Sequence, residues 1–175
     1  RDEGRARAMA DRFGAPHAFG SYEEMLASDT IDGVYIPLPT SQHVEWSIKA
    51  AEAGKHILCE KPLATTVEEC ERIVNAAEKA GVKHYLNHNY RRCPAIMLAK
   101  QLIDEGKVGR VFHFLGEYLQ SWIVDPNFPL TWHLRKETAA YGPHGDLGSH
   151  MIDLARFLIG EITSICGMTK QFITE

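Results

Sequence analysis

The sequence predicts an α/β fold built on a doubly wound, mostly parallel sheet. Over residues 1–90, short runs of β-branched, aromatic and aliphatic residues alternate with longer segments whose apolar residues recur at helical spacing. Gly14, Gly54 and Gly81 each follow one of the helical segments, as glycines do at helix C-termini. Strands that alternate with helices of this length form βαβ units. We therefore expect helices on both faces of the sheet.

Each element of this first part has its own boundary signals. Ser41, and Thr65 or Thr66, are expected N-caps, and two prolines end the first strand because proline cannot continue a ladder. The expected helices cover residues 2–13, 41–53 and 65–80, and the expected strands cover residues 31–39, 55–60 and 82–89. Cys59 is interpreted as a small hydrophobic residue of the second strand.

The pattern changes after residue 90. A helix is expected at residues 94–106, and the aromatic and β-branched residues of 108–122 predict a longer strand of a different, antiparallel sheet. A loop at 124–145, an amphipathic helix at 146–160 and a strand at 162–174 complete the chain. The predicted domains are residues 1–90 and 91–175, with the boundary near residues 89–94.

Composition excludes several classes of partner. The 175 residues are 45% hydrophobic, and the net charge of −4 contains no run of like charge that would indicate a nucleic-acid or membrane surface. No apolar run approaches the roughly 18 residues that span a bilayer. Four cysteines without a CxxC pair predict reduced thiols in a cytoplasmic protein. The first residues look like the middle of a βα unit, which suggests that the chain is a fragment.

Polar residues follow two of the predicted strands. Thr40 and His43 come after the first, and Glu60 and Lys61 come directly after the second. Ligands of open α/β sheets bind beyond the carboxyl ends of the strands, so these four side chains are expected on one rim. A solvated loop pair, with Pro62 as a turn residue, is the alternative interpretation of Glu60 and Lys61.

A second candidate is the pair Asp146 and His150, four residues apart at a helix start and therefore on one face. A carboxylate beside an imidazole orients the ring and raises its basicity, which general acid–base catalysis requires. The alternative is an N-cap Asp146 with a core histidine. Asp153 could be a structural partner of the same histidine or of a backbone group.

Other kinds of site find little support. The histidine pairs at 84 and 88 and at 144 and 150 have spacings that could recruit zinc, but they fall on different elements and no cysteine joins them, so no metal is expected. No GxGxxG motif occurs. A dinucleotide site would need a phosphate-binding turn upstream of Arg1.

Four segments together resemble the Gfo/Idh/MocA family of nicotinamide-dependent sugar and polyol dehydrogenases. They are VYIPLPTSQH at residues 34–43, AGKHILCEKPLATTVEEC at 53–70, NHNYRR at 87–92 and GDLGSHMIDLARFLIGE at 145–161. The EKP block is the family's hallmark, and its pairing with the Gly-Asp-x-Gly-Ser-His segment makes the resemblance specific.

The resemblance implies a fold and an activity. Residues 1–90 would form part of a Rossmann dinucleotide-binding domain, and residues 91–175 part of a substrate-binding and oligomerisation α+β domain with an open, mainly antiparallel sheet. The expected enzyme is an NAD- or NADP-dependent dehydrogenase acting on a CH–OH group of a cyclic polyol, sugar or sugar derivative, as a homo-oligomer (dimer or tetramer). The alternatives are a reductase of a non-sugar carbonyl or imine, and a non-catalytic nucleotide-binding regulator.

The resemblance also implies roles for individual residues. The catalytic set would be Lys61, Asp146 and His150, with His150 as general base, Asp146 orienting it and Lys61 hydrogen-bonded to the substrate oxygen; a proton relay through Lys61 is the competing assignment. The cofactor-binding residues would be Pro39, Thr40, His43, Glu60, Lys61 and Asn89. The substrate-binding residues would be Lys61, Tyr90, Trp132, His133, Asp146 and His150. Two positions depart from the family pattern, since Thr40 replaces a common Asn and His133 a usual Arg.

Overall fold

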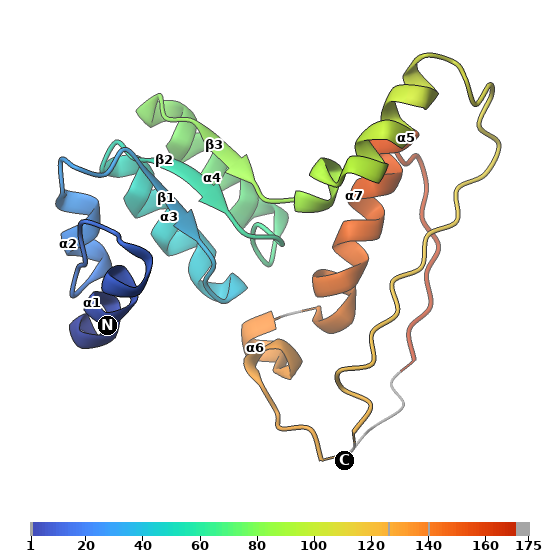
Figure 1. Ribbon diagram of the computed structural model, residues 1–175. Coiled ribbons are helices and arrows are strands. Elements are labelled where there is room, and N and C mark those ends of the chain that lie inside the picture. The colour runs from blue at the N-terminus through green and yellow to red at the C-terminus, as the bar shows by residue number, and fades with distance from the viewer. Residues whose placement is uncertain (1, 126, 140, 171–175) are drawn as a thin grey trace.

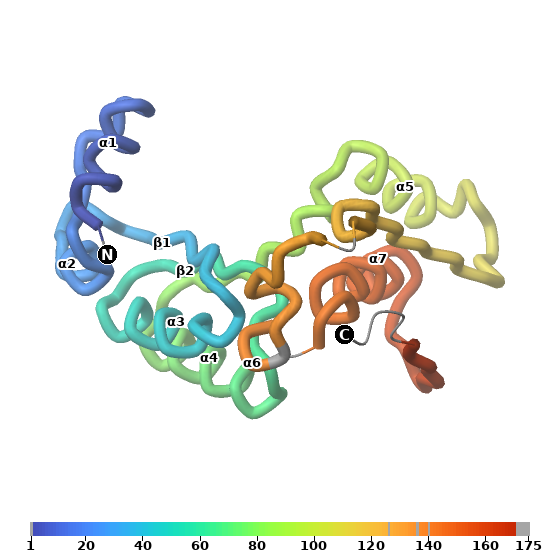
Figure 2. Tube along the Cα trace, turned by 90° about the horizontal axis from the view of Figure 1, so that it is seen from below, coloured from blue at the N-terminus to red at the C-terminus, as the bar shows by residue number. Residues whose placement is uncertain are grey.

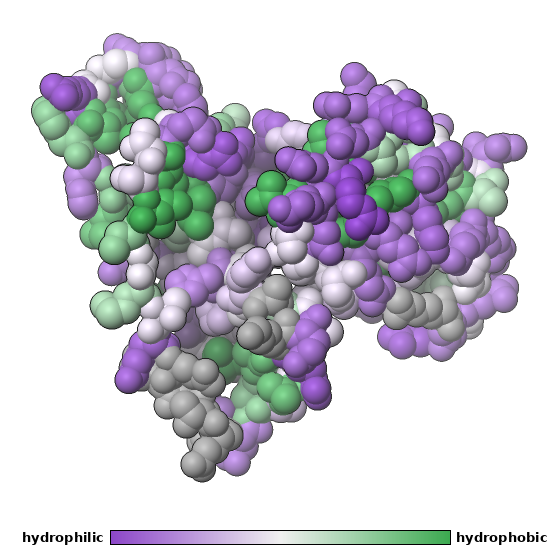
Figure 3. All heavy atoms as spheres, turned by 180° about the vertical axis from the view of Figure 1, so that it is seen from behind, coloured by the Kyte–Doolittle hydropathy of each residue, from purple (hydrophilic) through white to green (hydrophobic). Residues whose placement is uncertain are grey.

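The computed structural model describes residues 2–125, 127–139 and 141–170. The chain forms two lobes joined by a short connection after the third strand, with α1 and α2 at the end of the first lobe that lies farthest from the second (Figures 1 and 2). Among the described helices, none is long and apolar enough to cross a membrane. Seen from behind, apolar residues are exposed on the second lobe (Figure 3).

The first lobe is built on a parallel sheet of three strands, β1 (Gly33–Ile36), β2 (His56–Cys59) and β3 (His84–Leu86), in the order β1-β2-β3. Ile36 pairs with Cys59, and Cys59 pairs with Leu86, so the three carboxyl ends lie level. All three strands lie within the predicted segments, and the α/β class with a parallel sheet is confirmed.

Helices α3 (His43–Glu52) and α4 (Val67–Ala80) cover one face of this sheet (Figure 1). Alternate strand residues point at these helices because side chains alternate between the faces of a strand. The buried core comprises Leu26, Val34, Ile36, Ala50, Ala51, Ile57, Cys59, Ala77 and Val82. Cys59 is a buried strand residue, as expected, and burial raises the pKa of its thiol to about 11.

The opposite face of the sheet is uncovered by the described residues, which corrects the prediction of helices on both faces. Tyr35, Leu58 and Tyr85 project from the three strands on that side and are 53%, 36% and 52% exposed. Parallel sheets are ordinarily covered on both faces. The helices that connect β1 to β2 and β2 to β3 both lie on the same side, because right-handed crossovers in one direction along a sheet place their helices on one face.

Several helix boundaries agree with the sequence signals. In α1 (Glu3–Phe13), Asp2 accepts a hydrogen bond from the Arg5 amide, and Gly14 ends the helix in the left-handed conformation. The choice between Thr65 and Thr66 is resolved, because Thr66 caps α4 through the Glu69 amide.

Two features at other helix boundaries differ from the prediction. Ser41 is no cap, because the 3₁₀ turn η1 (Thr40–Gln42) leads directly into α3. The short helix α2 (Tyr22–Ala27), capped by Ser21, was not predicted; its six residues are too few to show a periodic pattern.

The second lobe begins with the 3₁₀ turn η2 (Asn89–Arg92) and α5 (Pro94–Asp104). It continues with η3 (Trp132–Leu134), the short helix α6 (Lys136–Ala139), the π-helical turn η4 (His144–Gly148) and α7 (Ser149–Leu158). Segment 124–145, expected to be a loop, therefore contains helical turns.

The antiparallel strands expected at 108–122 and 162–174 are absent from the described residues of these segments. Residues 111–121 and 160–170 run as extended chain without a ladder (Figure 2), and residues 171–174 of the second segment lie outside the described part. A strand exists only when a neighbour accepts its hydrogen bonds. The residue types of this segment favour a strand, but no neighbouring strand among the described residues pairs with it. Phe112 and Leu119 are accordingly each 84% exposed.

Candidate active site

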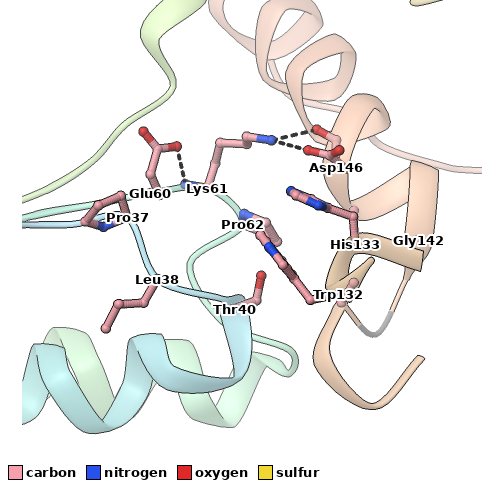
Figure 4. Close-up of a pocket in the computed structure, with 12 residues that line it drawn as sticks. Pro37, Leu38, Thr40, Glu60, Lys61, Pro62, Trp132, His133, Gly142 and Asp146 are labelled. Atoms are coloured by element: carbon pink, nitrogen blue, oxygen red, sulfur yellow. Dashed lines mark hydrogen bonds and ion pairs between the residues drawn. The ribbon is translucent and has the colours of Figure 1, made fainter. Parts of the chain in front are cut away.

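The candidate site lies where β2 ends and the second lobe begins (Figure 4). Glu60 and Lys61 follow directly on Cys59, and a cis peptide bond joins Lys61 to Pro62. The Lys61 side chain is only 14% exposed. This burial contradicts the alternative of a solvated loop pair.

Lys61 is held by a residue of the second lobe. Its Nζ donates to Oδ1 of Asp146 at 2.5 Å and to the backbone oxygen of Asp146 at 3.0 Å. Eighty-five residues separate the partners in sequence. An ammonium and a carboxylate at this distance form a charge-assisted hydrogen bond, the stronger kind in proteins. The contact ties the sheet rim to the turn that precedes α7.

Asp146 is at the centre of the π-helical turn η4. Its backbone oxygen accepts from Lys61 and also from the Ser149 hydroxyl at 3.3 Å. Single π turns are frequent at functional sites. No side chain caps α7, so Asp146 is not an N-cap, and its carboxylate contacts Lys61 rather than His150 as the helical spacing suggested. The α-helical spacing behind the one-face argument does not apply here, because the turn at Asp146 is π-helical, but the charge of Asp146 still acts on the His150 imidazole.

A cavity of about 170 Å³ opens beside this pair. Residues from both lobes line it: Pro37, Leu38, Thr40, Glu60, Lys61, Pro62, Trp132, His133, Ala139, Gly142, Gly145 and Asp146. Thr40, Glu60, Lys61, Trp132, His133 and Asp146 had been assigned to the site, and they do share one cavity. His150, His43, Tyr90, Asn89 and Pro39 are not among its lining residues.

Glu60 joins the ends of all three strands. Its Oε1 accepts from the Tyr35 hydroxyl at 2.7 Å and from the Asn87 amide at 2.6 Å, and its Oε2 accepts from the Lys61 backbone N–H at 3.2 Å. Burial opposes ionisation of Glu60, but these hydrogen bonds and Lys61 outweigh it and lower the pKa of the carboxyl. Tyr35 and Asn87 were missed by the sequence reasoning, although both fall at strand ends.

His43 lies behind the rim rather than on it. The side chain is 1% exposed, and its Nε2 is 2.7 Å from the Leu38 oxygen while its Nδ1 is 2.9 Å from the Pro62 oxygen. The imidazole therefore connects the turn after β1 to the turn after Lys61. In this position it shapes the cavity wall and does not face the cavity.

His150 is buried on α7, with 6% exposure, and Nδ1 has no hydrogen-bond partner among the described residues. Its ring stacks on Tyr90, with centroids 4.1 Å apart and planes inclined by 16°. Burial, followed by the charges of Lys61 and His88, lowers the pKa of His150. The core-histidine interpretation describes its packing, but the lowered pKa leaves a neutral imidazole that can accept a proton.

Trp132 and His133 face the cavity from η3 (Figure 4). Their rings stack on each other, with centroids 3.6 Å apart. Family members usually have an arginine at the position of His133. In this chain the histidine adds ring surface to the cavity wall instead of a guanidinium. Within the described residues, no group of three or more His, Cys, Asp or Glu side chains could hold a metal ion.

A parallel sheet that presents polar side chains at its carboxyl ends to a second lobe is the arrangement of Rossmann-type α/β proteins. The chain belongs to the Gfo/Idh/MocA oxidoreductase family. Residues 1–88 match the oxidoreductase family with an NAD-binding Rossmann fold, and residues 96–175 match the GFO/IDH/MocA C-terminal domain.

Named relatives of the chain include several sugar dehydrogenases. The chain is 42% identical to the levoglucosan dehydrogenase of Pseudarthrobacter phenanthrenivorans, over 97% of its own length and 44% of that protein. It is 37% identical to D-xylose 1-dehydrogenase (NADP(+)) 2 of Haloferax volcanii, over 91% of its own length and 48% of that protein. The chain thus spans less than half the length of these two relatives.

A solved structure extends the likeness to three dimensions. Levoglucosan dehydrogenase in complex with NADH and levoglucosan superposes with a TM-score of 0.86 at 44% identity, over 91% of this chain and 43% of that one. Both lobes are needed to reach this coverage. The fold of the family is therefore shown for the described chain as a whole.

Proposed function

We propose that this chain carries the catalytic rim of an NAD- or NADP-dependent dehydrogenase that acts on a CH–OH group of a cyclic polyol, sugar or sugar derivative. The observation that carries the proposal is the contact between Lys61 and Asp146, which sets a cation from the sheet rim against a carboxylate from the second lobe beside a cavity. Relatives named for levoglucosan, D-xylose and D-apiose support the substrate class.

The cavity suits the reactive end of a nicotinamide cofactor. Pro37, Leu38 and Pro62 supply apolar walls for a flat ring, and Thr40 and Glu60 supply polar groups for a ribose. Sites for cofactors combine apolar lining with a few placed polar groups and usually measure roughly 300–1,000 Å³. At about 170 Å³ this cavity accommodates one end of such a ligand. These residues would hold the nicotinamide end of the cofactor, which would supply the acceptor for the hydride of the alcohol carbon.

The residues of the chain would divide the remaining work. Lys61 donates a hydrogen bond to the substrate oxygen and stabilises the alkoxide character that develops there, as a preorganised donor should. Asp146 holds the ammonium of Lys61 in place through its carboxylate and its backbone oxygen. His150, neutral because its pKa is lowered, takes the hydroxyl proton.

The test is turnover by the whole protein that contains this sequence, with NAD and NADP each offered against a panel that includes levoglucosan, D-xylose and other sugars and polyols. Formation of reduced nicotinamide with at least one member is the expected result, and Lys61→Ala and His150→Ala should both abolish most of it. Undiminished turnover in both variants would contradict the mechanism. Cofactor binding without turnover in either direction would favour a nucleotide-binding regulator, and absence of binding would overturn the class.

We also propose that the protein is cytoplasmic and forms a homo-oligomer. We further propose that its nucleotide-binding part and its substrate-binding part meet at residues 89–94. The four cysteines are free thiols, in keeping with a reducing compartment. Exposed apolar side chains on the extended segments offer a surface for a second copy: Phe112, Leu115, Leu119, Ile165 and Met168. Sedimentation of the whole protein tests the oligomeric state. A monomer at all concentrations would contradict the proposed homo-oligomer.

A further inference from the structure

Two adjacent residues of η2 hold one face of α7. The Tyr90 ring stacks on the His150 ring, and the Arg91 guanidinium donates to both carboxylate oxygens of Asp153, at 2.8 and 2.5 Å. His150 and Asp153 are three residues apart on α7, so they lie on the same side of the helix. The Arg91 guanidinium also lies 5.0 Å from the centre of the Phe157 ring, one turn further along that face.

The imidazole of His150 has little else to orient it. Histidines that act in catalysis usually have one ring nitrogen hydrogen-bonded to a carboxylate or carbonyl, which sets the ring plane. Nδ1 of His150 is buried without such a partner among the described residues, and Asp146 is engaged by Lys61. The near-parallel stack on Tyr90 is the closest of the ring contacts around the imidazole, because the Tyr118 and His88 rings meet it edge-on with centroids 5.9 and 6.1 Å away.

The Tyr90 ring is itself held at its far end. Its hydroxyl is 2.5 Å from the Tyr118 hydroxyl, and the Tyr118 ring meets His150 edge-on, with centroids 5.9 Å apart and planes inclined by 66°. Two tyrosines thus enclose the imidazole on a face and an edge. Tyr118 belongs to the extended segment after α5, so both tyrosine rings come from the second lobe.

From these contacts we propose that Tyr90 is a positioning residue for His150: its ring sets the plane of the imidazole, while the Arg91–Asp153 pair fixes α7 against η2. This role rests on the proposed function, in which His150 takes the hydroxyl proton. It replaces the substrate contact that the family resemblance assigns to Tyr90. A misplaced base costs rate because proton transfer needs hydrogen-bond distance and alignment.

Kinetics of the whole protein separate the two roles of Tyr90. If the ring positions His150, Tyr90→Leu lowers kcat by about 10- to 100-fold and changes KM by less than about threefold, and Tyr90→Phe recovers most of the loss because it keeps the ring. A substrate contact through the hydroxyl predicts the reverse, a raised KM in Tyr90→Phe. That result would overturn the proposal.

A second measurement does not depend on turnover. In the native protein, the imidazole protons of His150 lie over the Tyr90 ring, so their nuclear magnetic resonances should be shifted upfield by the ring current. The shift should persist in Tyr90→Phe and disappear in Tyr90→Leu, with His150→Gln used for assignment. Normal positions in the native protein would overturn the stack without requiring any destabilised variant. If the shift is present but no substrate is turned over, the contact stands and the proposed function fails.

The His150 titration completes the test. The titratable side chains that contact this ring or act on its charge are Glu60, Lys61, His88, Tyr90, Tyr118 and Asp146. Of these, only the Tyr90 ring is removed in Tyr90→Leu. Readier access of water should raise the titration midpoint of His150 in this variant and leave it close to native in Tyr90→Phe. Equal midpoints in all three proteins, together with native kcat in Tyr90→Leu, would contradict the positioning role.

Discussion

Nζ of Lys61 lies 2.5 Å from Oδ1 of Asp146, although the first residue follows a strand of the parallel sheet and the second sits in a π-helical turn of the other lobe. The contact makes the site a property of both lobes together. In the mechanism that we propose, Asp146 holds the lysine, whereas the family resemblance implies that it orients the histidine.

Removing the Lys61 ammonium should affect the chemical step. Lys61→Ala is expected to lower kcat by about 100- to 1,000-fold, the usual loss for one donor aimed at developing negative charge. Lys61→Arg should recover only part of this, because a planar guanidinium cannot replace a compact ammonium in a buried position. Steady-state kinetics with saturating cofactor provide the measurement. The matched control is Lys83→Ala, an exposed lysine outside the cavity, which should retain native rates.

Activity should fall on the acid side with a midpoint below the usual histidine value. Burial, Lys61 and His88 lower the pKa of His150, so the base stays neutral to a lower pH than a free imidazole would. We expect kcat/KM to be level at neutral pH and to fall about tenfold per pH unit below a midpoint under about 6.5. A midpoint above that value would instead support a different base or a relay through Lys61.

Stability should respond to the same titrations. His88 and His150 both have lowered pKa values in the folded protein, with burial as the first cause in each. In the window between the lowered and the ordinary pKa, the unfolded chain binds more protons, so folding stability rises with pH there. Their contribution is therefore complete above about pH 6.5 and lost as the pH falls through the folded values. Denaturant midpoints of native protein and His88→Gln across this range measure the effect, and the variant should show a shallower pH dependence.

The hydrogen bond from the Tyr35 hydroxyl to Glu60 should contribute measurably to the free energy of unfolding. Tyr35→Phe removes the hydroxyl that donates to Glu60 and is expected to lower the free energy of unfolding by about 1 kcal/mol. Tyr85→Phe is the matched control on the same face, since its hydroxyl only accepts a 3.4 Å contact from Arg92. Urea unfolding distinguishes the two variants. Equal losses would show that Glu60 does not depend on Tyr35.

The pair between Arg91 and Asp153 allows a comparison of neighbouring arginines. Arg91→Met leaves a carboxylate that is 7% exposed without its partner, so the free energy of unfolding should fall by about 2 kcal/mol. Arg92→Met removes an exposed arginine of the same turn and should change stability by less than about 0.5 kcal/mol. Thermal unfolding of the two variants provides the measurement. A native transition in Arg91→Met would mean that α7 is held by other contacts.

Local patterns in the sequence determined the elements of the first lobe. The short apolar run at 57–59 and the capping residues Thr66 and Gly81 act within a few residues, so β2 and α4 follow from the chain itself. The rim position of Lys61 also follows, because any residue after a parallel strand reaches the carboxyl edge of the sheet. The resemblance to the family then rested on short motifs, the EKP block and the Gly-Asp-x-Gly-Ser-His segment, which can be read in the sequence although the two lie far apart.

Only the tertiary structure decided how the site is assembled. The contact between Lys61 and Asp146, 85 positions apart, depends on the approach of the two lobes. The stack of Tyr90 on His150 and the position of His43 behind the cavity wall depend on the packing of distant residues within one lobe. Residues 108–122 also show that local preference is not sufficient. Their side chains favour a strand, but a strand forms only where a partner accepts its hydrogen bonds. Residue type sets what each segment can form, and the packing of distant segments sets which of those possibilities is realised.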